Sequence, residues 1–281
     1  MIVSYREILG DAHKRHYGVG AFNCLSLEHV LGAIEAAENL HSPIILELAE
    51  VQFPYSPIEL MAPIFLEKAR KATVPVCVHL DHGQSFETCA RAIALGFNSV
   101  MIDSSLLPLE DNIAMTKEVV KMASAFGVDV EAELGMVGTI GVDEDRRTPD
   151  DIYTDVQESV KFVQETNIAA LAVAIGNMHG KYIATPKLNI ERLKEINQQN
   201  DIPLVLHGGS GTSVEDFKSC VHNGICKVNV ATALQMAVTE KIQNYMQTAN
   251  PNYIDMKYQI QEATKEAVEW HLNLFESVNK A

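Results

Sequence analysis

The sequence alternates eight times between a short apolar run and a longer segment with the residue spacing of an amphipathic helix. The runs, which we predict to be strands, are residues 17–23, 43–47, 74–81, 99–103, 129–134, 169–175, 203–207 and 227–230. The predicted helices are residues 26–40, 57–71, 85–95, 110–126, 154–166, 190–198, 214–223 and 233–247, with a helical tail after them. Strands separated by helices pair in parallel, and eight such units can close into a barrel.

The predicted fold is therefore α/β, a single (β/α)8 TIM barrel with a C-terminal helical extension. An open, doubly wound sheet has the same local pattern and is the alternative. The chain of 281 residues contains no Ser/Gly linker and no low-complexity segment, and barrels of this length form one domain. We therefore assign residues 1–281 to one domain.

The composition limits which partners the protein could bind and in which compartment it could reside. The formal net charge of −15 argues against a nucleic-acid partner, which would need a basic surface. The longest apolar stretches, such as residues 171–175, are too short to span a bilayer, and residues 1–20 lack the apolar region of a signal peptide. Five cysteines without a CxxC pair are typical of reduced thiols. We predict a cytoplasmic protein that binds neither nucleic acid nor membrane.

Polar side chains stand at the ends of nearly all the predicted strands. They are Asn23, Asp81 with His82, Asp103, Glu133, His179, His207 and Asn229. In a (β/α)8 barrel the carboxyl ends of the strands meet on one face, where active sites are built. Ionisable groups gathered there would be costly without a function, so we expect them to form a site.

Three of these strand ends carry a histidine. Neutral imidazoles from His82, His179 and His207, with a fourth position left open, would form a catalytic Zn²⁺ site. His79 lies two residues earlier on its strand, so we predict a core residue or an outer partner of the site. Histidines elsewhere are expected at the surface, among them His13, His41, His222 and His271.

Two glutamates lie on the same side of the fifth strand, because side chains alternate between the faces of a strand. Glu131 is the deeper one, and we expect it to form a salt bridge inside the barrel. Glu133 is nearer the mouth. It could approach the metal, or bind a second divalent ion together with Asp103.

Glycine-rich segments follow the seventh and eighth strands. Residues 207–212 run directly into a helix, and residues 229–232 open the next one. Exposed amides at helix starts bind anions, and barrels often hold a phosphate at these two loops. The pattern therefore indicates a phosphate-binding site beside the predicted metal site.

Five motifs, taken in order along the chain, resemble those of a known family. They are His-Leu-Asp-His-Gly (79–83), Val-Glu-Ala-Glu-Leu-Gly (130–135), Ala-Ile-Gly-Asn-Met-His-Gly (174–180), Leu-Val-Leu-His-Gly-Gly-Ser-Gly (204–211) and Val-Asn-Val-Ala-Thr (228–232). From about Tyr5 to Val268 the chain resembles the class II, zinc-dependent fructose/tagatose-bisphosphate aldolases. The resemblance implies Zn²⁺ on the three histidines and Asp81 as the catalytic acid/base.

The same resemblance implies how a sugar phosphate binds. The candidate substrate-binding residues are Asn23, Gly180, Lys181, Gly208, Gly209, Ser210, Asn229, Ala231 and Thr232. Most of them would surround the dihydroxyacetone phosphate half of the substrate. Relatives often bind a monovalent cation, Na⁺ or K⁺, near that phosphate, and we expect a homo-oligomer, either a dimer or a tetramer.

Departures from the family pattern concern the other half of the substrate. Ala49 stands where relatives commonly have a serine, and Ala231 replaces a polar residue. The loop at residues 138–145 differs from the usual one, with Glu144 as the candidate mobile carboxylate. Lys257 and Tyr258 stand where relatives often have an arginine for the distal phosphate.

The predicted function is zinc-dependent, reversible aldol cleavage of a ketose phosphate or bisphosphate, such as fructose or tagatose 1,6-bisphosphate. The products would be dihydroxyacetone phosphate and an aldehyde. Asp81 would take the C4 hydroxyl proton, and Glu144 would protonate the enediolate. One alternative is a metal-dependent barrel hydrolase, which the phosphate loops disfavour. Another is a non-catalytic aldolase-like partner subunit, which should have lost residues that this chain retains.

Overall fold

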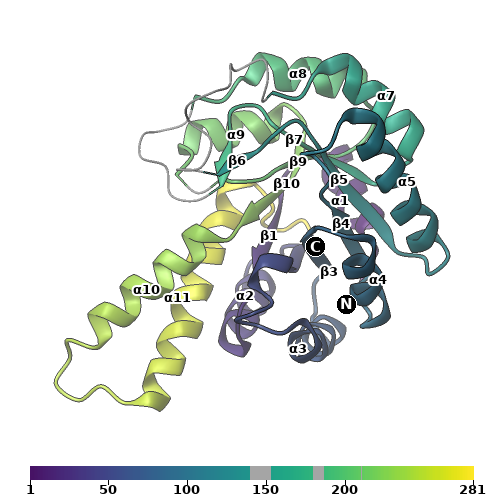
Figure 1. Cartoon of the computed structure of the whole chain (residues 1–281). Helices are drawn as coiled ribbons and strands as arrows, with labels where there is room; N and C mark the ends of the chain where they lie inside the picture. The colour runs from purple at the N-terminus through teal and green to yellow at the C-terminus, as the bar shows by residue number, and fades with distance from the viewer. Residues whose placement is uncertain (140–152, 180–186, 210) are drawn as a thin grey trace.

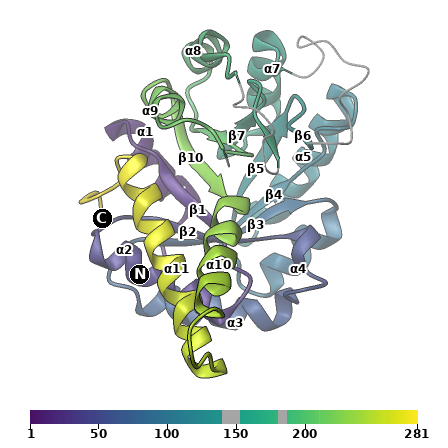
Figure 2. The ribbon, with the colours of Figure 1, turned by 90° about the vertical axis from the view of Figure 1, so that its left-hand side faces the viewer.

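The computed structural model describes residues 1–139, 153–179, 187–209 and 211–281. Its strands form a closed parallel barrel (Figures 1 and 2). In barrel order they are β1 (Val19–Asn23), β2 (Ile44–Ala49), β3 (Val76–Gly83), β4 (Ser99–Ile102), β5 (Asp129–Leu134), β7 (Ala170–Val173), β9 (Leu204–Leu206) and β10 (Ile225–Val230). Phe22 pairs with Leu46 on one side and with Val230 on the other, so β1 closes the sheet. The predicted barrel is confirmed, and the open sheet is excluded.

Helices follow the strands, and all of them except α10 cover the outside of the barrel (Figures 1 and 2). They are α2 (Leu27–Asn39), α3 (Ile58–Lys71), α4 (Phe86–Ala94), α5 (Leu109–Ser124), α7 (Val156–Thr166), α8 (Ile190–Gln199), α9 (Val214–His222) and α10 (Thr232–Tyr245). Several begin where a Ser or Asp side chain accepts a hydrogen bond from a first-turn amide, as Ser85 does for α4 and Asp155 for α7. A short helix η1 (Glu50–Gln52) follows β2, and β6 (Gly138–Thr139) pairs with β8 (Met178–His179) in a separate small sheet.

Alternation along the strands separates two apolar clusters. On β2, Ile44 and Leu46 face outward and pack in the large cluster between the strands and the helices. Ile45, between them, faces into the barrel and belongs to a second cluster. Helix α1 (Tyr5–Arg15) contributes Tyr5 and Leu9 to this inner cluster, so α1 closes the amino-terminal end of the barrel. This helix was not predicted from the sequence.

The chain ends in the predicted helical extension. Helices α10 and α11 (Tyr253–Leu274) form an antiparallel arm that projects beyond the barrel (Figures 1 and 2). The carboxyl-terminal part of α11 packs on the barrel, where His271 is buried beside Phe22 and Phe275. The expectation that His271 lies at the surface is therefore wrong, because the helical tail folds back over β1. Within the described residues, no helix is both long and apolar enough to cross a membrane.

Candidate active site

A cavity of about 530 Å³ opens at the carboxyl ends of the barrel strands. Many residues predicted from strand ends and loops line it. They are Asn23, Asp81, His82, Asp103, Glu133, His207, Gly208, Gly209, Asn229, Ala231 and Thr232. Barrel closure thus brings together side chains that are more than two hundred positions apart in the sequence.

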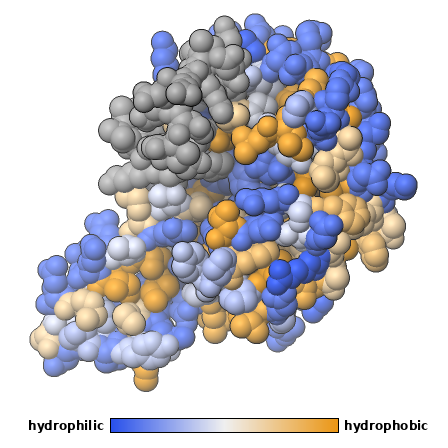
Figure 3. Space-filling model, viewed as in Figure 1, coloured by the Kyte–Doolittle hydropathy of each residue, from blue (hydrophilic) through white to orange (hydrophobic). Residues whose placement is uncertain are grey.

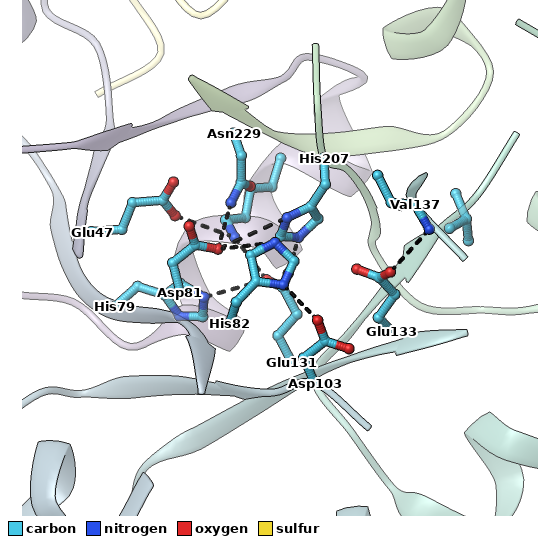
Figure 4. Close-up of polar contacts among 12 residues, drawn as sticks. Glu47, His79, Asp81, His82, Asp103, Glu131, Glu133, Val137, His207 and Asn229 are labelled. Carbon is cyan, nitrogen blue, oxygen red and sulfur yellow. Dashed lines mark hydrogen bonds and ion pairs between the residues drawn. The ribbon is translucent and has the colours of Figure 1, made fainter. Parts of the chain in front are cut away.

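Asp81 lies at the centre of this group, next to Asn229 (Figure 4), and two asparagines hold its carboxylate. Asn23, at the end of β1, donates from Nδ2 to Asp81 Oδ2 at 2.9 Å. Asn229, on β10, donates from Nδ2 to Asp81 Oδ1, also at 2.9 Å. Burial raises the pKa of Asp81, but the positive charges of His82, His207 and Lys227 outweigh it and lower this pKa to about 2. Asp81 is therefore an oriented carboxylate, able to accept a proton.

His82 follows Asp81 at an irregularity of the sheet. The register between β3 and β4 shifts between Leu80 and Gly83, and His82 has φ 44°. This left-handed conformation is unfavourable for a residue with a Cβ, and such conformations often occur at functional sites. Nδ1 of His82 lies 2.8 Å from Asp103 Oδ2. Burial lowers the pKa of His82, but the negative charges of Asp81, Asp103 and Glu133 outweigh it and raise this pKa to about 10. A metal ion bound at Nε2 would displace the proton there and leave Nδ1–H donating to Asp103. Nε2 lies 3.8 Å from Asp81 Oδ1.

His207 reaches the same place from the opposite side of the barrel. Its Nε2 donates to Glu131 Oε1 at 2.7 Å, which leaves the lone pair on Nδ1. Nδ1 lies 3.8 Å from Asp81 Oδ1, and the rings of His207 and His82 approach edge to face with 4.5 Å between centroids. Both histidines therefore have one nitrogen fixed by a carboxylate and the other directed toward Asp81 (Figure 4).

This arrangement fits a zinc ion. Metal-binding histidines usually donate their second N–H to a carboxylate, as His82 does to Asp103 and His207 does to Glu131. Ligand atoms of Asp81, His82 and His207 all lie within 4.8 Å of one another. The third predicted ligand, His179, belongs to β8, but its side chain lies outside the described residues.

A second acidic group adjoins the first. Ligand atoms of His82, Asp103 and Glu133 also lie within 4.8 Å of one another. Burial, together with the negative charge of Asp103, raises the pKa of Glu133 to about 8. Glu133 accepts from the Val137 amide at 3.4 Å. A cation bound here would favour the ionised form of Glu133.

A layer of buried charges lies beneath the mouth residues. Lys227 Nζ is 2.8 Å from Glu131 Oε2 and 3.5 Å from Glu47 Oε2, and all three side chains are fully buried. The interior salt bridge expected for Glu131 is confirmed. His79, at the same level, is buried, with Nδ1 2.8 Å from Ser99 Oγ. It is a core residue next to Glu131, since Nε2 lies 3.6 Å from Glu131 Oε2.

Three residues of this lower layer, Glu47, Lys227 and Tyr5, were not predicted from the sequence. Strand alternation could have indicated the first two, because Glu47 precedes Ala49 by two residues and Lys227 precedes Asn229 by two. Tyr5 precedes the first strand, so this signal does not apply to it. Further residues that follow the strands line the cavity without having been predicted: Val51, Gln52, Gln84, Ser105, Leu106, Met136, Val137 and Gln235.

Some predicted site residues are not placed in the cavity. Glu144, Gly180, Lys181 and Ser210 lie outside the described residues, so their predicted roles stay predictions. Lys257, the residue predicted to stand in place of an arginine for the distal phosphate, is paired with Glu28 near the start of α2.

The fold is a (β/α)8 barrel with a candidate metal site at the mouth, and comparison with known proteins defines the class of the protein. The model of the class II fructose-bisphosphate aldolase family matches residues 3–280. The chain is 40% identical to a probable fructose-bisphosphate aldolase of Bacillus subtilis (strain 168) and 38% identical to a fructose-bisphosphate aldolase of Staphylococcus aureus (strain Mu50). Both matches cover 100% of this chain and 99% of the relative.

A solved structure agrees with these relatives. The crystal structure of the YdjI aldolase from Escherichia coli K12 superposes with a TM-score of 0.91 at 35% identity, and the match covers both chains completely. The chain belongs to the class II fructose-bisphosphate aldolase family. It is an aldolase, a carbon–carbon lyase.

Proposed function

We propose that this aldolase reversibly cleaves a ketose phosphate or bisphosphate, in a zinc-dependent reaction, to dihydroxyacetone phosphate and an aldehyde. Fructose and tagatose 1,6-bisphosphate are the leading substrates. The observation that carries the proposal is Asp81 held by Asn23 and Asn229 between two histidines whose other nitrogens are fixed by carboxylates. Membership of the aldolase family favours this reaction over metal-dependent hydrolysis and over a non-catalytic subunit.

His82, His207 and His179 would hold the zinc ion. When bound, zinc would supply Lewis-acid polarisation of the ketose carbonyl, which takes up the electron pair of the breaking bond. Asp81 accepts the proton of the C4 hydroxyl while the C3–C4 bond breaks, and the aldehyde leaves. Asn23 and Asn229 keep the Asp81 carboxylate oriented toward that hydroxyl. We assign the return of a proton to C3 of the enediolate to Glu144.

The phosphate of the dihydroxyacetone half would bind where two loops meet. Gly208 and Gly209 after β9, and Thr232 at the start of α10, line the same cavity as Asp81. Backbone amides at such positions bind anions without a bulky side chain in the way. Gly180, Lys181 and Ser210 would complete the site, with a monovalent cation, Na⁺ or K⁺, beside the phosphate. A second divalent ion would bind at Asp103 and Glu133.

Removal of the metal tests the proposal. Dialysis against a chelator should abolish cleavage of fructose and tagatose bisphosphates, and one equivalent of Zn²⁺ should restore it. Zinc content, measured by mass spectrometry, should follow activity. Full turnover by the metal-free protein, with a Schiff base trapped by borohydride, would contradict the zinc mechanism.

We also infer a cytoplasmic homo-oligomer, a dimer or a tetramer. The five cysteines are buried free thiols, as expected in a reducing compartment. The arm of α10 and α11 exposes apolar side chains to solvent (Figure 3), among them Met246, Tyr253, Ile254 and Tyr258. Exposed apolar residues gathered on one projecting element favour association. Light scattering coupled to size-exclusion chromatography would give the assembly size.

A further inference from the structure

Tyr5 is a fully buried tyrosine whose hydroxyl lies inside the barrel. It belongs to the first turn of α1, the helix that closes the amino-terminal end. The hydroxyl donates a hydrogen bond to Glu131 Oε2. Glu131 in turn accepts the Nε2–H of His207 through its other oxygen, Oε1, at 2.7 Å (Figure 4). A continuous pair of hydrogen bonds therefore joins the closed end of the barrel to a predicted zinc ligand at its mouth.

The position of the Tyr5 hydroxyl is well determined by its surroundings. The Tyr5 ring stacks on His79, with 5.1 Å between centroids and 4° between planes. The next residue, Arg6, bonds Asp129 through both its backbone amide, at 2.9 Å, and Nε, at 3.0 Å. Asp129 and Glu131 are two residues apart on β5, so α1 is anchored to the same strand at the surface and in the interior.

We propose that Tyr5 is a positioning residue for the zinc site, acting on His207 through Glu131. The inference rests on the proposed function, because it assumes that His207 binds zinc. A carboxylate can rotate about the bond that joins it to its side chain. Tyr5 and Lys227 both donate to Oε2 of Glu131, which turns Oε1 toward His207. The orientation of the imidazole is then set by the barrel interior before any metal binds.

The alternative is that the Tyr5 hydroxyl only satisfies a buried carboxylate. Such a role would affect the stability of the fold and leave the metal site unchanged. Tyr17 provides a matched control. It is also buried, and its hydroxyl also donates to a carboxylate, Asp11 Oδ2, at 2.8 Å. Asp11, however, pairs with Arg15 at 2.9 Å, whereas Glu131 pairs with the predicted zinc ligand His207.

The test compares Tyr5→Phe with Tyr17→Phe in the full-length protein. Zinc affinity is measured by competition with a chelator, and kcat and KM are measured at saturating zinc. Loss of a group in direct contact with a metal ligand typically costs about 10- to 100-fold in affinity. Tyr5 contacts Glu131 and not the zinc ligand His207 itself, so the effect should be smaller. We expect Tyr5→Phe to weaken zinc binding by about three- to tenfold, and to change kcat more than it changes KM.

A spectrum adds a readout that does not depend on turnover. Co²⁺ in place of zinc should show altered visible absorption in Tyr5→Phe, because the spectrum reports the geometry of the ligands. Tyr17→Phe should match the wild-type protein in affinity, kcat and spectrum, even where thermal unfolding shows it to be less stable.

The outcomes separate this inference from the proposed function. If wild-type protein cleaves its substrate without zinc, the proposed function fails and this inference fails with it. If the wild type depends on zinc but Tyr5→Phe retains its zinc affinity, kcat and Co²⁺ spectrum, only the role assigned to Tyr5 is overturned. A loss of stability alone in Tyr5→Phe would overturn that role in the same way.

Discussion

Asp81 obtains its orientation from two asparagines that come from opposite ends of the barrel sequence. Asn23 and Asn229 each bind a different carboxylate oxygen at 2.9 Å, and both side chains are buried. Neither asparagine has a charge, so they hold Asp81 in place without neutralising it. The carboxylate therefore remains available for proton transfer while its position is fixed.

Substitution of Asp81 should separate chemistry from binding. Asp81→Ala is expected to retain zinc and to bind dihydroxyacetone phosphate, because the histidines and the phosphate loops are untouched. Cleavage should fall by about two to four orders of magnitude, the usual effect of losing a positioned acid/base. Steady-state kinetics and calorimetric binding of dihydroxyacetone phosphate would measure the two effects. A kcat within a few-fold of wild type would show that another group takes the proton.

The strands place their polar side chains in two levels. Glu47, His79, Glu131 and Lys227 form the lower level, and the residues two positions later on each strand line the cavity. This arrangement follows from strand geometry, in which every second side chain points to the same face. The lower level supports the upper one directly, as Glu131 does for His207.

Helix α11 contains a buried histidine that should make the stability of the fold depend on pH. His271 is buried between α11 and β1, and burial lowers its pKa to about 4, whereas an unfolded histidine has a pKa near 6.5. Above pH 6.5 both states are neutral at this residue, and no penalty arises. As pH falls below 6.5, the unfolded state binds a proton that the folded state does not. Stability should therefore decrease with acidification in this range.

The His271→Phe variant should lose this pH dependence. Between pH 7.5 and pH 5.0, the free energy of unfolding of the wild type should fall by about 2 kcal/mol more than that of His271→Phe. Urea unfolding at the two pH values would measure the difference. Substitution of the exposed His222, His222→Gln, serves as the control and should behave like the wild type. Equal losses in wild type and His271→Phe would contradict this explanation.

At the scale of the whole molecule, the protein and its proposed substrate have charges of the same sign. The protein has a formal net charge of −15, and its proposed substrate is an anion. Long-range attraction cannot bring the two together, so binding must rely on local donors. On the side proposed for dihydroxyacetone phosphate, glycine amides and a helix start would serve this purpose. No lysine or arginine among the described residues lines the cavity, and Ala49 stands on the side proposed for the aldehyde.

This asymmetry predicts relaxed selection of the aldehyde. A site rejects a wrong ligand strongly only when the ligand would leave the buried donors of the site unpaired. The aldehyde side has few such donors, and Lys257 is paired with Glu28. Condensation of dihydroxyacetone phosphate with a panel of phosphorylated and neutral aldehydes should show several accepted, with some tolerance at C4. Strict use of glyceraldehyde 3-phosphate, with other aldehydes rejected by more than roughly a thousandfold, would contradict the prediction.

Much of the fold and part of the site were accessible from the sequence. Helical periodicity, apolar runs and strand-end chemistry are properties of neighbouring residues, so they predicted the eight strands and placed Asp81, His82 and His207 at one face. They also predicted the interior salt bridge of Glu131. The burial of His271 was predicted wrongly, because one histidine in a helix gives no local sign of which side the helix presents to the core.

The amino-acid sequence by itself determined the order of the elements and the chemical character of the mouth of the barrel, since both are encoded in short stretches. Only the tertiary structure decided the partners: Asn23 and Asn229 on Asp81, Lys227 on Glu131, and the hydroxyl of Tyr5 on the same glutamate. Tyr5 and Glu131 are 126 positions apart. Contacts between such distant residues arise when the barrel closes and α1 docks at its end, and they leave no periodic trace in the sequence.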